Sequence, residues 1–128
     1  MTLSDRFEAG MRVRRRVLGD AHVDRATAAA TALDADFQRF VTETAWGSVW
    51  ARDGLTPRER SLVTLALLAG LGNFEELALH ARATTNTGAT PEEIAETMLH
   101  VAVYAGVPRA NHALKVVKQA LAESEAER

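Results

Sequence analysis

Cysteine is absent from the 128 residues, and its absence excludes disulfide frameworks, zinc–thiolate sites, iron–sulfur clusters and every thiol nucleophile. Peroxidase chemistry that depends on a pair of cysteines is therefore impossible for this chain. The formal net charge is only −2, so no global basic field favours nonspecific binding to nucleic acid or to an anionic membrane. We expect neither a nucleic-acid partner nor a membrane partner.

Long apolar runs are also missing. The longest run without a charged residue, at 61–74, is well short of the roughly 20 residues that a membrane span requires. Residues 1–19 are interrupted throughout by charged side chains and do not resemble a signal peptide. These observations predict a cytoplasmic protein. The length and the 47% content of hydrophobic residues predict a single soluble domain over residues 1–128.

Strand signals are nearly absent, because every long apolar segment has the three- and four-residue spacing of a helix. The chain is therefore predicted to be all-α, with six helices. An additional short, alanine-rich helix at 20–31 is an open alternative. The six predicted helices begin near Ser4, after Asp34, at Thr56-Pro57, near Asn73, at Thr90-Pro91 and near Pro108.

Two of the predicted helices have more apolar surface than one small core requires. In the helix after Asp34, a wheel of about 100° per residue places Phe37 and Phe40 on the face toward the chain's own core, and Trp46 and Trp50 opposite them. The helix after Pro57 is apolar around nearly its whole circumference. We expect a homo-oligomer with both tryptophans at a subunit interface or at a pocket beside it. The alternative is a central helix that its own chain wraps completely.

One arginine lies in an apolar stripe. In the first predicted helix the stripe consists of Leu3, Phe7, Met11 and Leu18, and Arg14 falls near its middle. A guanidinium at such a position is costly unless a carboxylate or an anionic ligand meets it. Arg14 is therefore a candidate clamp for an anion. The alternative is a structural ion pair with an internal Asp or Glu.

Glu76 and His80 stand four residues apart, so their side chains share one face of a helix. A carboxylate beside a half-buried imidazole is suited to proton transfer. The alternative interpretation is structural, because Glu76 is also the third residue of a possible capping box with Asn73. The remaining histidines show no metal-binding spacing, so we expect no metal. They are His22, His100 and His112.

Several segments together resemble one known family. They are VRRRVLGDAHVD at 13–24, AWG at 45–47, WARDGL at 50–55, RSLVT at 60–64, ELALH at 76–80, and His100 with YAGVP at 104–108. This pattern closely resembles the carboxymuconolactone decarboxylase family, within the alkyl hydroperoxidase D-like superfamily, and extends from about Phe7 to Leu121. Redox members of the superfamily carry a Cys-x-x-Cys where this chain has Phe74 and Leu77. The resemblance is therefore to the decarboxylase branch.

The resemblance implies an all-α subunit in a ring-like homo-oligomer, and we expect a hexamer. It also implies a cofactor-free decarboxylase that converts 4-carboxymuconolactone to β-ketoadipate enol-lactone and CO2 in the catabolism of protocatechuate. The ligand would be a small lactone with two carboxylates. Two alternatives stay open: a related enzyme that acts on another lactone or β-keto acid, and a non-catalytic helical oligomer.

The resemblance and the residue chemistry together assign roles at the site. A clamp for a dianion is expected at Arg14 and Arg15, with Arg60 as a further candidate by family position. His80 is expected to supply a proton or a hydrogen bond to the lactone oxygen, assisted by Glu76. The substrate-binding positions are thus Arg14, Arg15, Arg60, Trp50, His22 and His100, and the catalytic positions are His80 and Glu76.

Overall fold

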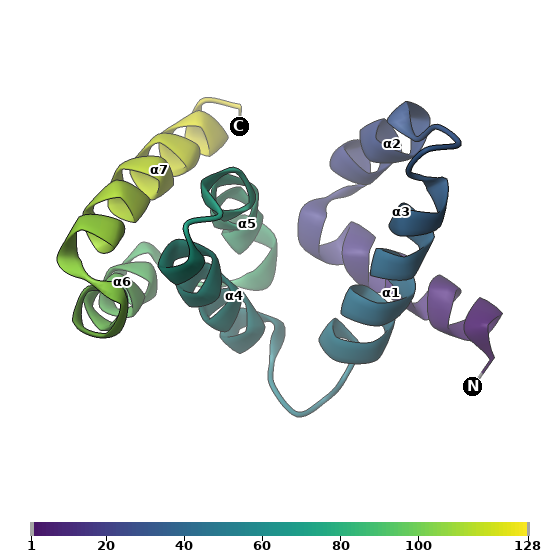
Figure 1. Cartoon of the computed structure of the whole chain (residues 1–128), viewed down its shortest axis with the longest axis horizontal. Helices are drawn as coiled ribbons and strands as arrows, with labels where there is room; N and C mark the ends of the chain where they lie inside the picture. Colours follow the sequence, from purple (N-terminus) through teal and green to yellow (C-terminus); the bar gives the residue numbers. More distant parts are fainter. Residues whose placement is uncertain (1, 128) are drawn as a thin grey trace. The chain divides into compact units, whose positions relative to one another are not determined.

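The computed structural model describes residues 2–127, without the side chain of Leu3, and this whole range contains helices and no strand (Figure 1). The all-α prediction is confirmed. The elements are α1 (Leu3–Leu18), α2 (Asp20–Ala29), α3 (Ala35–Val41), the π-helix η1 (Thr42–Trp50), α4 (Pro57–Leu71), α5 (Phe74–Thr87), α6 (Pro91–Ala105) and α7 (Val107–Ala126).

The described residues form seven α-helices, so the predicted count of six is wrong. The additional helix is α2, the alanine-rich segment that the sequence left open. It follows α1 without a loop because Gly19, at φ 91°, turns the chain in a conformation that favours glycine. The helix predicted after Asp34 is divided into α3 and the π-helical segment η1.

The chain divides into two compact units, one ending at Thr56 and the other beginning at Pro57. The first unit contains α1, α2, α3 and η1, and the second contains α4 to α7. The single domain over residues 1–128 stays a prediction.

In the first unit, the most extensive packing is between α1 and η1. The two backbones meet at Gly10 of α1 and Gly47 of η1. A Cβ atom built on Gly10 would fall on the carbonyl oxygen of Thr42 and 2.8 Å from the backbone nitrogen of Gly47, which is too close for any side chain. A Cβ atom on Gly47 would collide with the carbonyl of Arg6. The two glycines therefore set the separation of these helices.

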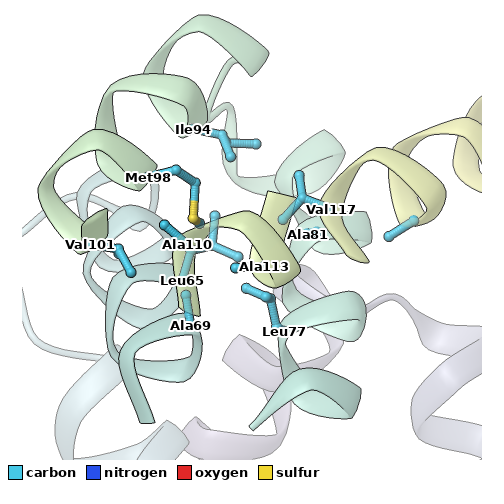
Figure 2. Packing of buried hydrophobic residues seen from close by; sticks show 11 residues of the cluster. Leu65, Ala69, Leu77, Ala81, Ile94, Met98, Val101, Ala110, Ala113 and Val117 are labelled. Atoms are coloured by element: carbon cyan, nitrogen blue, oxygen red, sulfur yellow. The ribbon is translucent and has the colours of Figure 1, made fainter. Parts of the chain in front are cut away.

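In the second unit, α4 to α7 surround one apolar core (Figure 2). Its largest fully buried side chains include Leu65, Leu77, Ile94 and Met98. The helix starts at Pro57 and Pro91 match the sequence prediction.

The start of α6 is additionally held by its capping box. Thr90 accepts a hydrogen bond from the backbone of Glu93, and the Glu93 carboxylate accepts one from the backbone of Thr90. This backbone contact, with the nearby positive charge of Arg58, holds the pKa of the Glu93 carboxyl below its usual value.

One side of α4 is apolar and exposed. Val63, Leu67 and Leu71, at four-residue intervals, form an exposed stripe, while Leu65 and Ala69 lie in the core. The alternative in which the chain wraps this helix completely does not fit these exposures. The apolar surplus that the sequence indicated is therefore present on the surface of the chain.

The assignment of faces in the helix after Asp34 is wrong. Phe37 and Phe40, expected to face the core, are 60% and 61% exposed, whereas Trp46 is only 5% exposed. The separation of the two faces agrees with these exposures, because the phenylalanines and Trp46 differ in burial. The face taken for the core was the wrong one, since the part of this helix that packs most extensively on α1 is the π-helical η1, which carries Trp46. An interface role for the tryptophans stays a prediction.

We predict that Gly10→Ala destabilises the protein by about 1–3 kcal/mol, because the added methyl group must push the backbones of α1 and η1 apart. An alanine in a helix otherwise stabilises by about 0.5–1 kcal/mol relative to glycine, so the expected sign is opposite to the propensity effect. Chemical denaturation measures the difference. Gly54→Ala is the control, because a Cβ atom there meets nothing within 4 Å. Equal stabilities of the two variants would contradict the close contact.

Candidate functional site

The guanidinium of Arg14 lies inside the first unit, where its residue is only 7% exposed. Nη1 donates to the hydroxyl of Thr42 at 3.3 Å, and Nη2 donates to the side-chain carbonyl of Gln38 at 3.1 Å. Both of these acceptors are neutral, and a neutral acceptor orients a guanidinium without cancelling its charge. The burial of Arg14 that the sequence predicted is confirmed.

Arg14 lines a cavity of about 340 Å³ within the first unit. This volume is in the range of sites for small organic ligands. Apolar and polar side chains share the wall, so the cavity can accept a small molecule with both a hydrocarbon part and a charged group. Its lining residues are Phe7, Met11, Arg14, Thr27, Ala30, Ala35, Asp36, Gln38, Arg39 and Thr42.

Arg39 brings a second guanidinium to the wall of this cavity. Its Nε lies 2.7 Å from the carboxylate of Glu43, one turn further along the chain. Its guanidinium carbon lies 4.9 Å from the centre of the Phe7 ring, a cation–π distance. Because Glu43 compensates the charge of Arg39, the cation that this cavity offers a ligand is Arg14, and Asp36 also lies on the wall. The buried guanidinium of Arg14 is the group that can bind an anionic ligand.

Arg15, the neighbouring candidate, has a different environment. Its Nη1 lies 3.1 Å from the carboxylate of Asp20 and 2.9 Å from that of Asp24, so it joins α1 to α2. The hydrogen bonds to Asp20 and Asp24 raise the pKa of Arg15 above its usual value. These ion pairs give Arg15 a structural role, and its substrate contact stays a prediction.

The other two candidates of the first unit are half-buried. The ring of Trp50 packs against that of Trp46, with 5.0 Å between ring centres. His22 lies on α2, one residue before the fully buried Val23. Neither residue is among those that line the cavity at Arg14.

In the second unit, His80 lies on α5 and is only 7% exposed. Its Nδ1 atom is fully buried. Glu76, one turn earlier, is exposed. Asn73 makes no side-chain capping hydrogen bond, so the structure does not contain the capping box that offered a structural explanation for Glu76.

The two remaining candidates also belong to the second unit. Arg60 is half-buried in the first turn of α4, next to Ser61, whose hydroxyl accepts a hydrogen bond of 2.9 Å from Thr87. His100 is exposed on α6 and stacks on the exposed ring of Tyr104, with 6.2 Å between ring centres.

The predicted residues thus divide between the units: Arg14, Arg15, His22 and Trp50 belong to the first, and Arg60, Glu76, His80 and His100 to the second. Gln38, Thr42 and Arg39 were not predicted from the sequence. The four-residue spacing of Gln38 and Thr42 would have placed them on one helix face. Nothing in the sequence indicated that this face meets Arg14, because that depends on the packing of α1 against η1.

Two features are absent from residues 2–127. No group of three His, Asp or Glu side chains lies close enough together there to hold a metal ion. In the same residues, none of the helices has both the length and the apolar character needed to cross a membrane.

Comparisons with known proteins agree with the resemblance. The model of the carboxymuconolactone decarboxylase family matches residues 35–119. A 4-carboxymuconolactone decarboxylase from Acinetobacter baylyi is 42% identical over 119 residues, which cover 93% of this chain and 89% of that protein. A second protein of that name, from Pseudomonas putida, is 47% identical over 47 residues, which cover 37% of this chain and 98% of that sequence.

A relative with a different name is similar to the same extent. Nitrosuccinic acid decarboxylase from Metarhizium robertsii is 43% identical over 115 residues, which cover 90% of this chain and 80% of that protein. From the family match and these identities, the chain belongs to the carboxymuconolactone decarboxylase family. The predicted family and the predicted enzyme class, a carboxy-lyase, are confirmed.

We predict that succinate raises the melting temperature more than acetate does at equal ionic strength, because the cavity at Arg14 favours a small anion with an apolar part. A ligand at 100 times its Kd stabilises by about 2.7 kcal/mol, which a thermal-shift measurement resolves. Arg14→Gln should remove the difference between the two anions. Arg16→Gln, an exposed arginine two residues further along α1, is the control and should retain it. Equal shifts by succinate and acetate in the unmodified protein would contradict a built anion site.

Proposed function

We propose that this chain decarboxylates 4-carboxymuconolactone to β-ketoadipate enol-lactone, without a cofactor, in the catabolism of protocatechuate. The observation that carries the proposal is the 42% identity to the Acinetobacter enzyme of that name over 93% of the chain. The buried guanidinium at the cavity of the first unit supports it, because the substrate carries two carboxylates.

The substrate itself supplies the electron sink. The bond between the γ-carbon and its carboxylate breaks, CO2 leaves, and the electron pair moves through the ring double bond onto the lactone carbonyl oxygen. Return of one proton to the α-carbon then gives the enol-lactone. The protein must bind a dianion, stabilise the charge that grows on the lactone oxygen, and supply the proton.

The residues are assigned to these tasks by their chemistry. Arg14 binds a substrate carboxylate, since it is buried, permanently charged and oriented by two hydrogen bonds. His80 donates the proton or the hydrogen bond, because a buried imidazole can be neutral or charged near physiological pH. Glu76 assists it from the preceding turn. Further contacts with the substrate are proposed for Arg15, Arg60, Trp50, His22 and His100.

A second candidate substrate is nitrosuccinate, favoured by the 43% identity to the decarboxylase of that name. The two substrates share a succinate skeleton: the carbon that loses CO2 also bears a CH2–COO− arm and an electron-withdrawing group. In nitrosuccinate the electron pair moves onto the nitro group to form a nitronate. A protein that binds the retained carboxymethyl arm can serve either reaction. A non-catalytic scaffold is not supported, because both named relatives are enzymes.

A ring-like homo-oligomer, a hexamer by the family resemblance, belongs to the same proposal. The exposed apolar stripe Val63, Leu67 and Leu71 supports it, since burial of such a stripe against another copy removes apolar surface from water. We also propose a cytoplasmic location. A stable and active monomer of 13.9 kDa in light scattering would contradict the oligomer.

The experiment that tests the proposed function is CO2 release from each of the two substrates by the purified protein. We expect a kcat/KM for 4-carboxymuconolactone at least tenfold above that for nitrosuccinate, which corresponds to about 1.4 kcal/mol of difference in transition-state binding. The reverse order would assign the chain to the second candidate. If the protein releases CO2 from neither substrate, both candidate functions are wrong.

Arg14 and His80 should give different kinetic signatures. Arg14→Lys should mainly raise KM, because a point charge replaces a bidentate fork that acts in ground and transition states alike. His80→Ala should lower kcat by a factor on the order of 10² to 10⁴, since it removes a proton donor or a hydrogen bond to the growing charge. Glu76→Gln should lower kcat by less. Steady-state kinetics on correctly assembled variants distinguish the effect on KM from the effect on kcat.

The contradicting result is a His80→Ala variant with nearly normal kcat. The Glu76 and His80 pair would then be structural, and the proton donor would have to be His22 or His100.

A further inference from the structure

The guanidinium of Arg14 is held by a short chain of hydrogen bonds that begins where α3 becomes π-helical. Thr42 Oγ1 accepts from Nη1 of Arg14 at 3.3 Å and donates to the backbone carbonyl of Gln38 at 2.8 Å. The side-chain carbonyl of Gln38 accepts from Nη2 of Arg14 at 3.1 Å. Gln38 therefore contacts the arginine twice, once directly and once through the hydroxyl of Thr42.

The backbone fixes both acceptors. Thr42 is the first residue of η1 and is only 1% exposed, and its backbone N–H donates to the carbonyl of Gln38. Gly47 lies five residues further on, one π-helical turn away, at the point of backbone contact with α1. Arg14 lies one α-helical turn after Gly10, the other half of that contact. The Arg14 side chain and the Thr42 hydroxyl consequently meet directly beside the closest approach of the two helices.

We propose that Gln38 and Thr42 are positioning residues for Arg14, and that the guanidinium they orient binds the carboxymethyl carboxylate that the substrate retains. The proposal rests on the function proposed above and names the part of the substrate that this cavity recognises. Of the two carboxylates of the succinate skeleton, only the retained one keeps its charge throughout the reaction. A fixed buried guanidinium can bind the retained carboxylate equally well before and after CO2 leaves. Strong binding of the departing carboxylate would instead stabilise the substrate relative to the transition state and slow the loss of CO2.

The chemistry of the two acceptors supports this role. An aspartate or glutamate in place of Gln38 would hold Arg14 more firmly, since a charge-assisted pair is stronger than a bond to an amide. It would also neutralise the guanidinium toward a ligand. The neutral amide and the hydroxyl constrain the geometry of the fork without themselves cancelling its positive charge.

Gln38→Glu separates a positioning role from a merely structural one. If Gln38 only stabilises the fold, Glu should preserve or raise the melting temperature and leave ligand binding intact. If Gln38 orients a cation for an anionic substrate, Glu should preserve the melting temperature but weaken succinate binding about 10- to 100-fold, because the new carboxylate competes for Arg14. Ala28→Glu, which adds the same charge at an exposed position of α2, is the control and should leave binding unchanged.

Thr42→Val and Thr42→Ser form a second pair of variants. Thr42→Val keeps the side-chain shape but loses the hydroxyl, and should raise the Kd for succinate and the KM for the lactone about tenfold with little change in kcat. Thr42→Ser should restore both values. Thr44→Val is the matched control, because the Thr44 hydroxyl donates to the carbonyl of Phe40 at 2.7 Å in the same helix. It should bind succinate as the unmodified protein does.

Calorimetric titration with succinamate, which carries one carboxylate, and with succinamide, the neutral diamide, gives the direct readout. The unmodified protein should prefer succinamate, because Arg14 binds a single carboxylate, and Gln38→Glu and Thr42→Val should lose most of that preference. If both variants keep the preference, or if Thr42→Val behaves as Thr44→Val does, the positioning role is wrong. Failure of the proposed function can be distinguished from failure of the positioning role. In the first case the unmodified protein would release CO2 from neither substrate, and these titrations would still decide the role of Gln38 and Thr42.

Discussion

The contact between the backbones of α1 and η1 at Gly10 and Gly47 is the constraint on which the first unit depends. A side chain at either glycine would occupy space that the other helix already fills. The close approach also brings together two residues that lie one turn away from the glycines. These residues are Arg14 on α1 and Thr42 on η1. A buried guanidinium is costly by itself, and this packing supplies the hydroxyl and the amide that bond to it. The proposed anion site is therefore a consequence of how two helices pack.

Such a site suits a reaction in which the substrate contributes most of the chemistry. An electron-withdrawing group beside the departing carboxylate accepts the electron pair, so the protein has to orient a dianion, stabilise the growing charge and return a proton. In the proposed function, a permanently charged arginine that Gln38 and Thr42 orient performs the first task at any physiological pH. The same logic explains how relatives named for a lactone and for a nitro acid can both be 42–43% identical to this chain. The retained arm is common to both substrates, whereas the electron sink differs.

The sequence predicted what depends on local chemistry and missed what depends on packing. The starts of α4 and α6 were predictable because Pro57 and Pro91 follow threonine and precede glutamate. The burial of Arg14 was predictable from an α-helical wheel, because α1 is a regular helix. In the helix after Asp34 the wheel separated two apolar faces but did not show which one meets the core, since that depends on the contact of η1 with α1. Gln38 was missed for the related reason that its partner lies 24 residues earlier in the chain.

A crystal structure with bound 2-methylsuccinate, a dicarboxylate that lacks an electron sink and cannot react, tests the central claim most directly. The account predicts that the ligand occupies the cavity at Arg14 with its CH2–COO− carboxylate within 3.2 Å of both Nη atoms, while Gln38 and Thr42 keep their hydrogen bonds to the same guanidinium. A ligand bound elsewhere, with the Arg14 cavity empty at a saturating concentration, would contradict it.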